Sequence, residues 1–322
     1  MFNQLSSDDA NEPKLLAQAL KNPALYGDGD PSWSDAQTAS QAVTARRKIA
    51  KFLRNRGEGS KHRLLASTVG ACEPNSPCLS GACPACMRAS QRWFVGTAPR
   101  TFHPDDELLA TSLVFEIVEQ GKLSAANVKR SIARVKRVFR KAGIGLAVGG
   151  LDISFNEERD SDDPGHWALQ LMVLVSAKDR SVWEKTLRSA YPRTDLVPRP
   201  IFIQPFDGAP AGWAYEFKPN FVRRVSYSSE RMVNGVLRPC RNTSDQPLRV
   251  TERLELLPFL NDLGLAGRLF LIGARTTNTL WGIAIVPIGK RQSVRKRKRR
   301  VGAANWPVRR SKGRKNAATR NP

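Results

Sequence analysis

Histidine, acidic side chains and long apolar runs are all scarce in this chain, and each scarcity excludes a class of protein. Only three of the 322 residues are histidines, which leaves little for acid–base chemistry, and neither a Ser-His-Asp arrangement nor a Walker phosphate loop is present. The longest strongly apolar stretch, Leu169–Val175, is too short to span a bilayer. Met1–Pro13 contains acids where an export signal needs a basic start and an apolar run, so we expect a cytoplasmic protein.

The shortage of acids leaves a strongly basic chain, with 52 Lys and Arg against 29 Asp and Glu and a formal net charge of +23. Residues 290–322 hold 14 of these basic residues and no acid, so residues 1–289 keep a net charge of +9. Such an excess attracts polyanions, because each phosphate contact releases condensed counterions. We predict a nucleic-acid partner rather than an acidic protein or a membrane surface, since apolar lipid anchors are missing.

Cysteine is also rare, and four of the five cysteines crowd into the segment ACEPNSPCLSGACPAC. Cys72, Cys78, Cys83 and Cys86 can close a tetrahedral Zn²⁺ shell, and the Gly, Pro and Ser residues between them favour tight turns. A shell of four thiolates leaves no open coordination position, so the predicted zinc is structural. Two disulfides, a redox-active Cys-x-x-Cys and four ordinary thiols are the alternatives; the expected cytoplasmic location and the lack of a preceding apolar strand disfavour the first two.

Changes of composition divide the chain into five predicted regions. An acidic, disordered arm spans 1–42, a basic helix with the cysteine segment spans 43–100, and an α+β core spans 101–232. A C-terminal helix and hairpin fill 233–289, and the basic tail 290–322 is expected to stay disordered until a partner binds.

The core region predicts a basic helix between strands. Ser124 is its expected N-cap and Gly143 its stop, and apolar residues recur at helical spacing from Val128 to Phe139. The β-α-β-β order that follows predicts an α+β fold with an antiparallel central sheet and flanking helices. The other expected elements are strands at Leu113–Val118, Leu151–Phe155, Ala168–Val175 and Pro200–Phe206, helices at Ser181–Ala190 and Arg249–Leu263, an irregular stretch at Asn242–Pro247, and a hairpin of Leu269–Gly273 with Trp281–Pro287.

The order of these parts resembles a known family over roughly residues 72–230. A cysteine segment ending in Cys-Pro-x-Cys, a strand, a basic helix, a strand bearing Asp152 and a strand opening with His166 is similar to the replication initiators of rolling-circle plasmids. Those proteins are DNA-nicking enzymes with a ferredoxin-like core, in which two histidines and an acid bind Mg²⁺ or Mn²⁺ and a tyrosine attacks a phosphodiester.

The resemblance implies a degraded version of that site. Asp152 and His166 would be ligands of the divalent ion, Ala168 replaces the second histidine, and Gln170 would supply a weaker oxygen ligand. Either Tyr215 or Tyr227 would be the nucleophile. A histidine that merely caps the end of a strand is the alternative for His166.

The leading hypothesis is therefore a nucleic-acid-binding protein, with DNA favoured over RNA, that is related to plasmid replication initiators and has weak or lost nicking activity. We expect it to be associated with the nucleoid or with plasmids. A working endonuclease with a tyrosine nucleophile is one alternative, and a zinc-stabilised RNA-binding module without catalysis is another.

The predicted nucleic-acid contacts combine cations with one aromatic ring that could stack on a base. Basic helix faces of this kind are also typical of solvated surface, and Trp93 beside Arg92 is as typical of a core residue. The predicted contacts are Arg46, Arg47, Lys51, Arg54, Arg88, Arg92, Arg130, Arg134, Arg137, Lys218, Phe221, Arg223, Arg224, Arg297, Lys298 and Arg299.

Overall fold

The structure is a computed structural model that describes residues 12–28, 37–159, 164–233 and 235–288. The chain divides into two compact units, Met1–Gly289 and Lys290–Pro322. The second unit coincides with the predicted basic tail and lies outside the described residues, as do the predicted contacts Arg297, Lys298 and Arg299.

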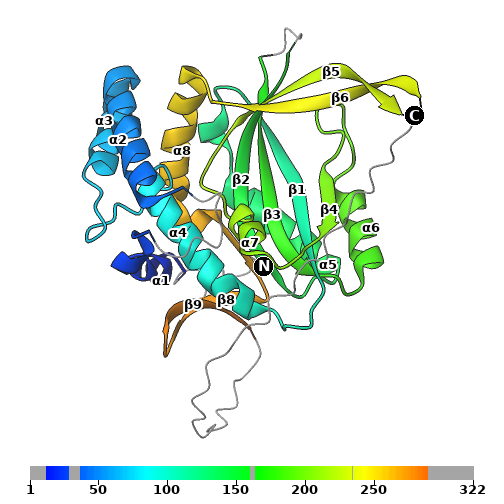
Figure 1. Ribbon diagram of the computed structural model, residues 1–322, viewed down its shortest axis with the longest axis horizontal. Helices are drawn as coiled ribbons and strands as arrows, with labels where there is room; N and C mark the ends of the chain where they lie inside the picture. The colour runs from blue at the N-terminus through cyan, green and yellow to red at the C-terminus, as the bar shows by residue number, and fades with distance from the viewer. Residues whose placement is uncertain (1–11, 29–36, 160–163, 234, 289–322) are drawn as a thin grey trace, which may run out of the picture. The chain divides into compact units, whose positions relative to one another are not determined.

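A mixed sheet of seven strands forms the centre of the first unit, with strand order β4-β1-β3-β2-β5-β6 and β7 paired to β2 (Figure 1). Every pairing in it is antiparallel except that of β5 with β2, which is parallel. The predicted α+β class is confirmed, but the sheet is mixed, because the chain crosses the sheet before β5 begins. The strands are β1 (Leu108–Glu119), β2 (Ala147–Glu158), β3 (His166–Ser176), β4 (Ile201–Pro205), β5 (Arg223–Val233), β6 (Val236–Gln246) and β7 (Leu269–Ile272).

The central strand β3 contains the apolar stretch Leu169–Val175, which lies between β1 and β2 as its composition predicted. In the described part of the chain, no helix is both long enough and apolar enough to cross a membrane.

Helices α5 (Val128–Lys141) and α6 (Arg180–Ala190) cover one face of the sheet, behind it in Figure 1. Val135 and Phe139 of α5 and Trp183 of α6 share one buried cluster with Leu171 and Val173 of β3. The predicted apolar stripe of α5 is thus confirmed as core. The helix begins after Asn127 rather than Ser124, because the Asn127 side chain accepts a hydrogen bond from Arg130 N.

The opposite face of the sheet is crossed by α7 (Pro210–Tyr215) and the segment that follows it. Gly150 of β2 permits this crossing, since a Cβ atom there would lie 2.5 Å from the ring of Phe217. This crossing positions residues 216–221 directly over the polar centre of the sheet.

A helical layer lies beside the sheet and encloses the cysteine segment. Its helices share one large apolar core with the sheet. The 3-10 turns are η1 (Pro23–Leu25), η2 (Ala98–Thr101) and η3 (Leu123–Ala125), and the helices are α1 (Glu12–Ala19), α2 (Ala39–Arg56), α3 (Gly59–Gly70), α4 (Pro84–Thr97) and α8 (Val250–Arg268).

The prediction of a wholly disordered arm over 1–42 is wrong for its described part. Helix α1 buries Leu16 and the next turn buries Leu20, and both residues belong to the main core. Acidic residues throughout 1–42 and the Gly, Asp, Pro and Ser run at 27–34 predict a disordered arm, but the apolar side chains of Leu16 and Leu20 lie four residues apart and dock as one helical face.

Two further predictions near the C-terminus are corrected. Leu269–Ile272 does not belong to the hairpin: as β7 it pairs with β2, and the hairpin consists of β8 (Ala274–Thr279) and β9 (Gly282–Pro287). The stretch predicted as irregular, Asn242–Pro247, is strand up to Gln246, because it pairs with β5 along its whole length.

Candidate metal centre and nucleic-acid interface

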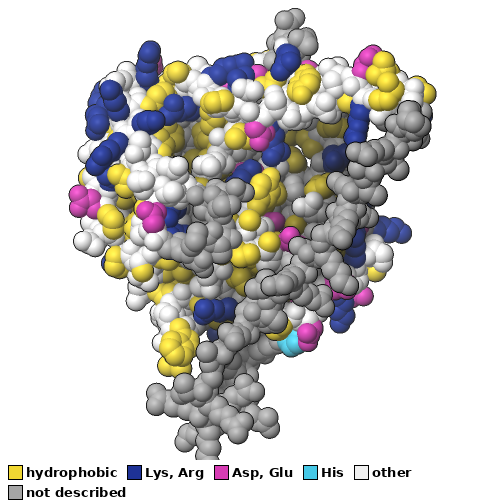
Figure 2. Space-filling model, in the orientation of Figure 1, with side chains coloured by type: hydrophobic (Ala, Val, Ile, Leu, Met, Phe, Trp, Pro, Cys, Tyr) yellow, Lys and Arg dark blue, Asp and Glu magenta, His cyan; other side chains and the backbone are white. Residues whose placement is uncertain are grey.

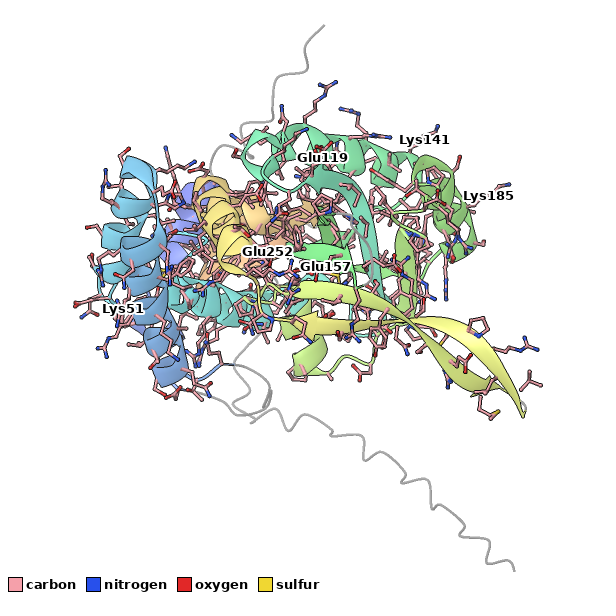
Figure 3. All side chains as sticks on the ribbon, turned by 90° about the horizontal axis from the view of Figure 1, so that it is seen from above. Lys51, Glu119, Lys141, Glu157, Lys185 and Glu252 are labelled. Atoms are coloured by element: carbon pink, nitrogen blue, oxygen red, sulfur yellow. The ribbon has the colours of Figure 1, made fainter. Side chains whose placement is uncertain are left out.

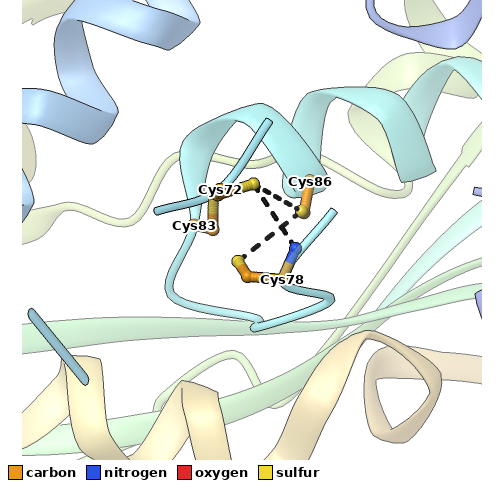
Figure 4. Close-up of side chains that lie close together, drawn as sticks. All are labelled: Cys72, Cys78, Cys83 and Cys86. Carbon is orange, nitrogen blue, oxygen red and sulfur yellow. Dashed lines mark hydrogen bonds between the residues drawn. The ribbon is translucent and has the colours of Figure 1, made fainter. Parts of the chain in front are cut away.

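The four clustered cysteines converge on one point, with all their Sγ atoms within 4.8 Å of one another (Figure 4). Cys86 Sγ lies 3.5 Å from Cys72 Sγ and 3.8 Å from Cys78 Sγ. A tetrahedral zinc with Zn–S bonds of about 2.3 Å separates its sulfur ligands by about 3.8 Å, whereas a disulfide joins them at about 2.0 Å. The spacing fits four separate ligands around one ion and excludes two disulfides in this arrangement.

Local backbone structure explains how four cysteines that are spaced so widely in the sequence converge on one point. Cys72 follows the end of α3, while Cys83 is the N-cap of α4 and Cys86 lies in its first turn behind Pro84. The five residues between Cys72 and Cys78 fold back through a small bridge between Glu73 and Ser76. The loop therefore delivers all four thiols to one side of α4.

Contacts beyond the four sulfurs orient them. The Cys78 backbone N–H donates to Cys72 Sγ at 3.4 Å, and the Tyr26 hydroxyl donates to Cys86 Sγ at 3.9 Å. Hydrogen bonds from Cys72 and Cys78 raise the pKa of the Cys83 thiol, as expected where several buried sulfurs share one site. A soft cation such as zinc would let all four sulfurs be thiolates at once, so the donor set and its burial suit a structural zinc ion.

The basic residues that follow the cysteines are structural rather than exposed. The Arg88 side chain is buried, and its guanidinium donates to the carbonyl oxygens of Gly27 and Gln37. Arg92 also donates to Gly27 O, at 2.7 Å. The Trp93 side chain is buried, and its indole N–H donates to Ile283 O at 2.8 Å. The prediction that Arg88 contacts nucleic acid is therefore wrong, because this side chain instead holds the N-terminal segment against α4.

Two of the predicted divalent-metal ligands do meet, at the centre of the sheet. Asp152 and Gln170 lie directly opposite each other on β2 and β3, and Gln170 Nε2 donates to Asp152 Oδ2 at 2.6 Å. The Lys218 ammonium lies 2.9 Å from the same oxygen. An amide N–H and a protein cation thus both lie on Oδ2, while Asp152 Oδ1 is buried without a hydrogen-bond partner among the described residues.

His166 lies elsewhere on the sheet. It is opposite Asn156 of β2 and Glu119 of β1, four residues along β3 from Gln170, a separation of about 13 Å. Among the described residues, the cysteine cluster is the only group of three or more His, Cys, Asp or Glu side chains close enough to share a metal ion.

The two candidate tyrosines also separate. Tyr215 ends α7 and is 48% exposed, with the Lys218 ammonium 5.2 Å from its ring centre. Tyr227 lies on β5 beneath Arg159, beyond the last residue pairing with β2 and about 20 Å from Asp152. Of the two, only Tyr215 is next to the Asp152 centre.

Two residues of this centre were not predicted. Glu216 is buried, its Oε2 has no hydrogen-bond partner, and burial followed by the nearby Asp152 charge raises its pKa to about 8. Arg268 is fully buried and donates to Leu151 O and Lys218 O. Glu216 directly follows Tyr215 in the sequence, but no local pattern indicates that Arg268, 52 residues further along, belongs to the same centre.

The cations around Phe221 are also paired within the protein. Arg223 forms an ion pair with Glu157, Arg224 approaches Asp245 at 3.7 Å, and the Phe221 ring is half-buried beneath the Arg268 guanidinium. Arg223 thus joins β5 to β2, Arg224 joins β5 to β6, and Lys218 joins the crossing segment to β2.

Two helices instead carry cations that form no ion pair with an acid among the described residues. Helix α5 carries seven Lys and Arg residues and no acid, and Arg130, Arg134, Arg137 and Lys141 form one stripe at i, i+4, i+7 and i+11. These four side chains are exposed.

Helix α2 repeats the pattern on the other side of the molecule, where Figure 3 shows Lys51 on its outer surface. Arg47, Lys51 and Arg54 lie at i, i+4 and i+7 on an exposed face, and Figure 2 shows dark blue side chains gathered over α2 and α3. Arg46 instead turns inward and lines a cavity beside Tyr26 and Cys72.

When compared with protein-family models, with curated proteins and with solved structures, the chain matches none of them.

Purified protein should contain about one zinc per chain, and replacing Cys83 with serine should remove it. Loss of the ion should destabilise the fold by about 3 kcal/mol or more, since metal binding contributes directly to folding. Elemental analysis and thermal melting measure both effects. Cys240→Ser, which changes the thiol outside the cluster, should alter neither, and a wild-type zinc content far below one would contradict the assignment.

Replacing Lys218 with methionine should lower the free energy of unfolding by about 3 kcal/mol, because it leaves Asp152 buried without its ammonium partner. Adding Asp152→Asn should recover part of the loss. Denaturant unfolding of the single and double variants measures the coupling. Lys61→Met, which breaks the exposed ion pair with Asp262, is the matched control and should cost less than about 1 kcal/mol; equal losses from the two lysine variants would contradict this account.

Glu216 should make the protein less stable as the pH rises. Its pKa is raised from 4.5 to about 8, so the folded state keeps a proton that the unfolded state releases between these values. Stability therefore falls across pH 4.5–8, by roughly 2–4 kcal/mol, and is level above that interval. Glu216→Gln should remove this slope, as measured by urea unfolding at pH 5 and pH 8. Exposed Glu107→Gln should keep the slope, and a slope that survives in Glu216→Gln would assign it to another group.

Proposed function

We propose that this protein binds nucleic acid, with DNA favoured over RNA, on a scaffold held together by one structural zinc ion. The contacts that carry the proposal are the exposed basic stripes of α5 and α2. The preference for DNA follows from the similarity in the order of parts to the rolling-circle replication initiators.

The stripe of α5 is the observation that carries most weight. Like charges four residues apart destabilise a helix, and here Arg130, Arg134, Arg137 and Lys141 repeat that spacing with no acid in the helix. The stripe is about 17 Å long, and duplex DNA presents one phosphate charge per about 1.7 Å of its axis. A polyanion laid along α5 would turn this repulsion into attraction.

The neighbouring helix α6 shows that such repulsion is not a general feature of this surface. There, Glu184 binds both Arg180 and Arg188, at 3.2 and 2.6 Å. Both arginines of α6 thus share one acid within the helix, whereas the cations of α5, which packs beside it, have no acid in their own helix.

Binding without metal-dependent cleavage is the form of the proposal that the sheet centre favours. Lys218 supplies the positive charge next to Asp152, and His166 lies too far along β3 to share an ion with that carboxylate. In this proposal the Asp152 centre stabilises the fold, and the basic helices bind.

The salt dependence of binding tests the proposal. Fluorescence anisotropy with a labelled 20-base-pair DNA duplex, over a NaCl series, should give a steep log–log slope for the wild-type chain. Arg130→Ala/Arg137→Ala should bind at least tenfold more weakly, with a slope flatter by about 1.8, because two phosphate contacts are lost.

The control is Lys14→Ala/Lys21→Ala, which removes the same charge from exposed positions on and just after α1. It should keep the wild-type slope. Equal losses in the two variants would mean that only net charge matters, and a wild-type chain that binds neither DNA nor RNA would end the proposal.

A further inference from the structure

Strands β5 and β6 form a two-stranded ribbon that extends away from the helical layer (Figures 1 and 3). They pair with each other along their full length, but β5 pairs with β2 only over Arg223–Ser226. From Tyr227 to the turn, about 20 Å of ribbon has no third strand among the described residues. The turn carries Asn234-Gly235 in the sequence, a dipeptide typical of tight hairpins, and Gly235 has a φ of 76°.

The tip of this ribbon places like charges side by side. Arg231 and Arg238 are directly opposite each other in the register, and both are exposed. Neither forms an ion pair with a described residue, and Glu230 points to the other face of the ribbon. Two arginines paired across strands destabilise a ribbon, so the pairing is unfavourable unless an anion lies between or beside them.

At the base of the ribbon the cations are neutralised instead. Arg223 pairs with Glu157 and Arg241 pairs with Glu158. The unmatched positive charge is therefore confined to the part of the ribbon that extends beyond the sheet.

The same tip exposes apolar side chains. Met232 and Leu237 are opposite each other on the second face, and they are 59% and 57% exposed. An uncovered ribbon of this kind is a liability in a free protein.

The face that carries the two arginines also carries polar side chains able to read bases. Ser229 and Asn242 lie on it, joined by a hydrogen bond of 2.7 Å. Arginine and asparagine form bidentate contacts with guanine and adenine in the major groove of B-form DNA, which is wide enough for a two-stranded β-ribbon. The major groove of A-form RNA is too narrow for one.

We infer that the β5–β6 ribbon is an arm that enters the major groove of duplex DNA, with the Arg231 and Arg238 face toward the nucleic acid. This inference depends on the proposed nucleic-acid binding and adds to it the form of nucleic acid that is bound. It assigns the choice of duplex DNA over duplex RNA to the ribbon, and the charge-driven part of binding to α5 and α2.

The experiment compares full-length wild type with Arg231→Ala/Arg238→Ala on a 20-base-pair DNA duplex and an RNA duplex of the same sequence. Wild type should bind the DNA duplex at least tenfold more tightly. The variant should lose at least tenfold on DNA, show a slope flatter by up to about 1.8, and lose its preference over RNA. Lys14→Ala/Lys21→Ala, with the same change in charge, should retain the preference.

Each other outcome has a definite meaning. If wild type binds DNA but the ribbon variant still prefers the DNA duplex over the RNA duplex, the inference about the ribbon is contradicted and the proposed function stands. If wild type binds no nucleic acid, both fail. Thermal melting checks that the variant is folded. Light scattering detects a ribbon that pairs with a second copy of the chain, and a dimer lost in the variant together with DNA binding would assign the ribbon to self-association instead.

Discussion

The buried guanidinium of Arg268 is the interaction on which most of this structure depends. It donates to Leu151 O of β2 and to Lys218 O after α7, contacts Met87 Sδ of α4, and lies 5.0 and 4.9 Å from the ring centres of Phe217 and Phe221. Burial lowers its pKa to about 10, so it stays charged at neutral pH. One cation thus joins the sheet, the crossing segment and the cysteine-bearing helix, and by holding the Lys218 backbone it directs that ammonium to Asp152.

The cysteine centre belongs to the same chain of support. Ser80 Oγ in the cysteine loop donates to Asn261 Oδ1 of α8 at 2.8 Å, and a Cβ atom at Gly81 would lie 2.4 Å from Leu260 O. The loop therefore packs on α8, the helix that ends in Arg268. A metal ion that fixes Cys83 and Cys86 at the start of α4 would also fix Met87 against the guanidinium. The cysteine cluster and the sheet centre are thus coupled through packing.

Local patterns predicted those parts of the fold whose causes are local. The apolar stripe of α5, the apolar strand β3 and the convergence of four cysteines all follow from spacings of a few residues. The ion pair of Asp152 with Lys218 joins residues that are 66 positions apart in the sequence, and no local pattern predicts it. Arg88 and Arg92 look equivalent in sequence, but Arg88 is covered by an N-terminal segment whose folding was not predicted. The end of β6 was predicted as an irregular stretch. Both faces of the ribbon are exposed, so its residues do not alternate between apolar and polar as those of a half-buried strand do.

The distribution of acids, more than the number of cations, separates structural from binding surface in so basic a chain. Glu157 holds both Arg223 and Arg249, and Asp262 holds Lys61, so each of these cations has a structural partner. The stripe of α5, the outer face of α2 and the ribbon tip lack such partners among the described residues, and each places like charges at distances where they repel. Each such repulsion costs about 0.2–0.5 kcal/mol in a helix, and a bound polyanion would turn it into attraction. Net charge predicts that an anionic partner exists, and the unpaired cations predict where it binds.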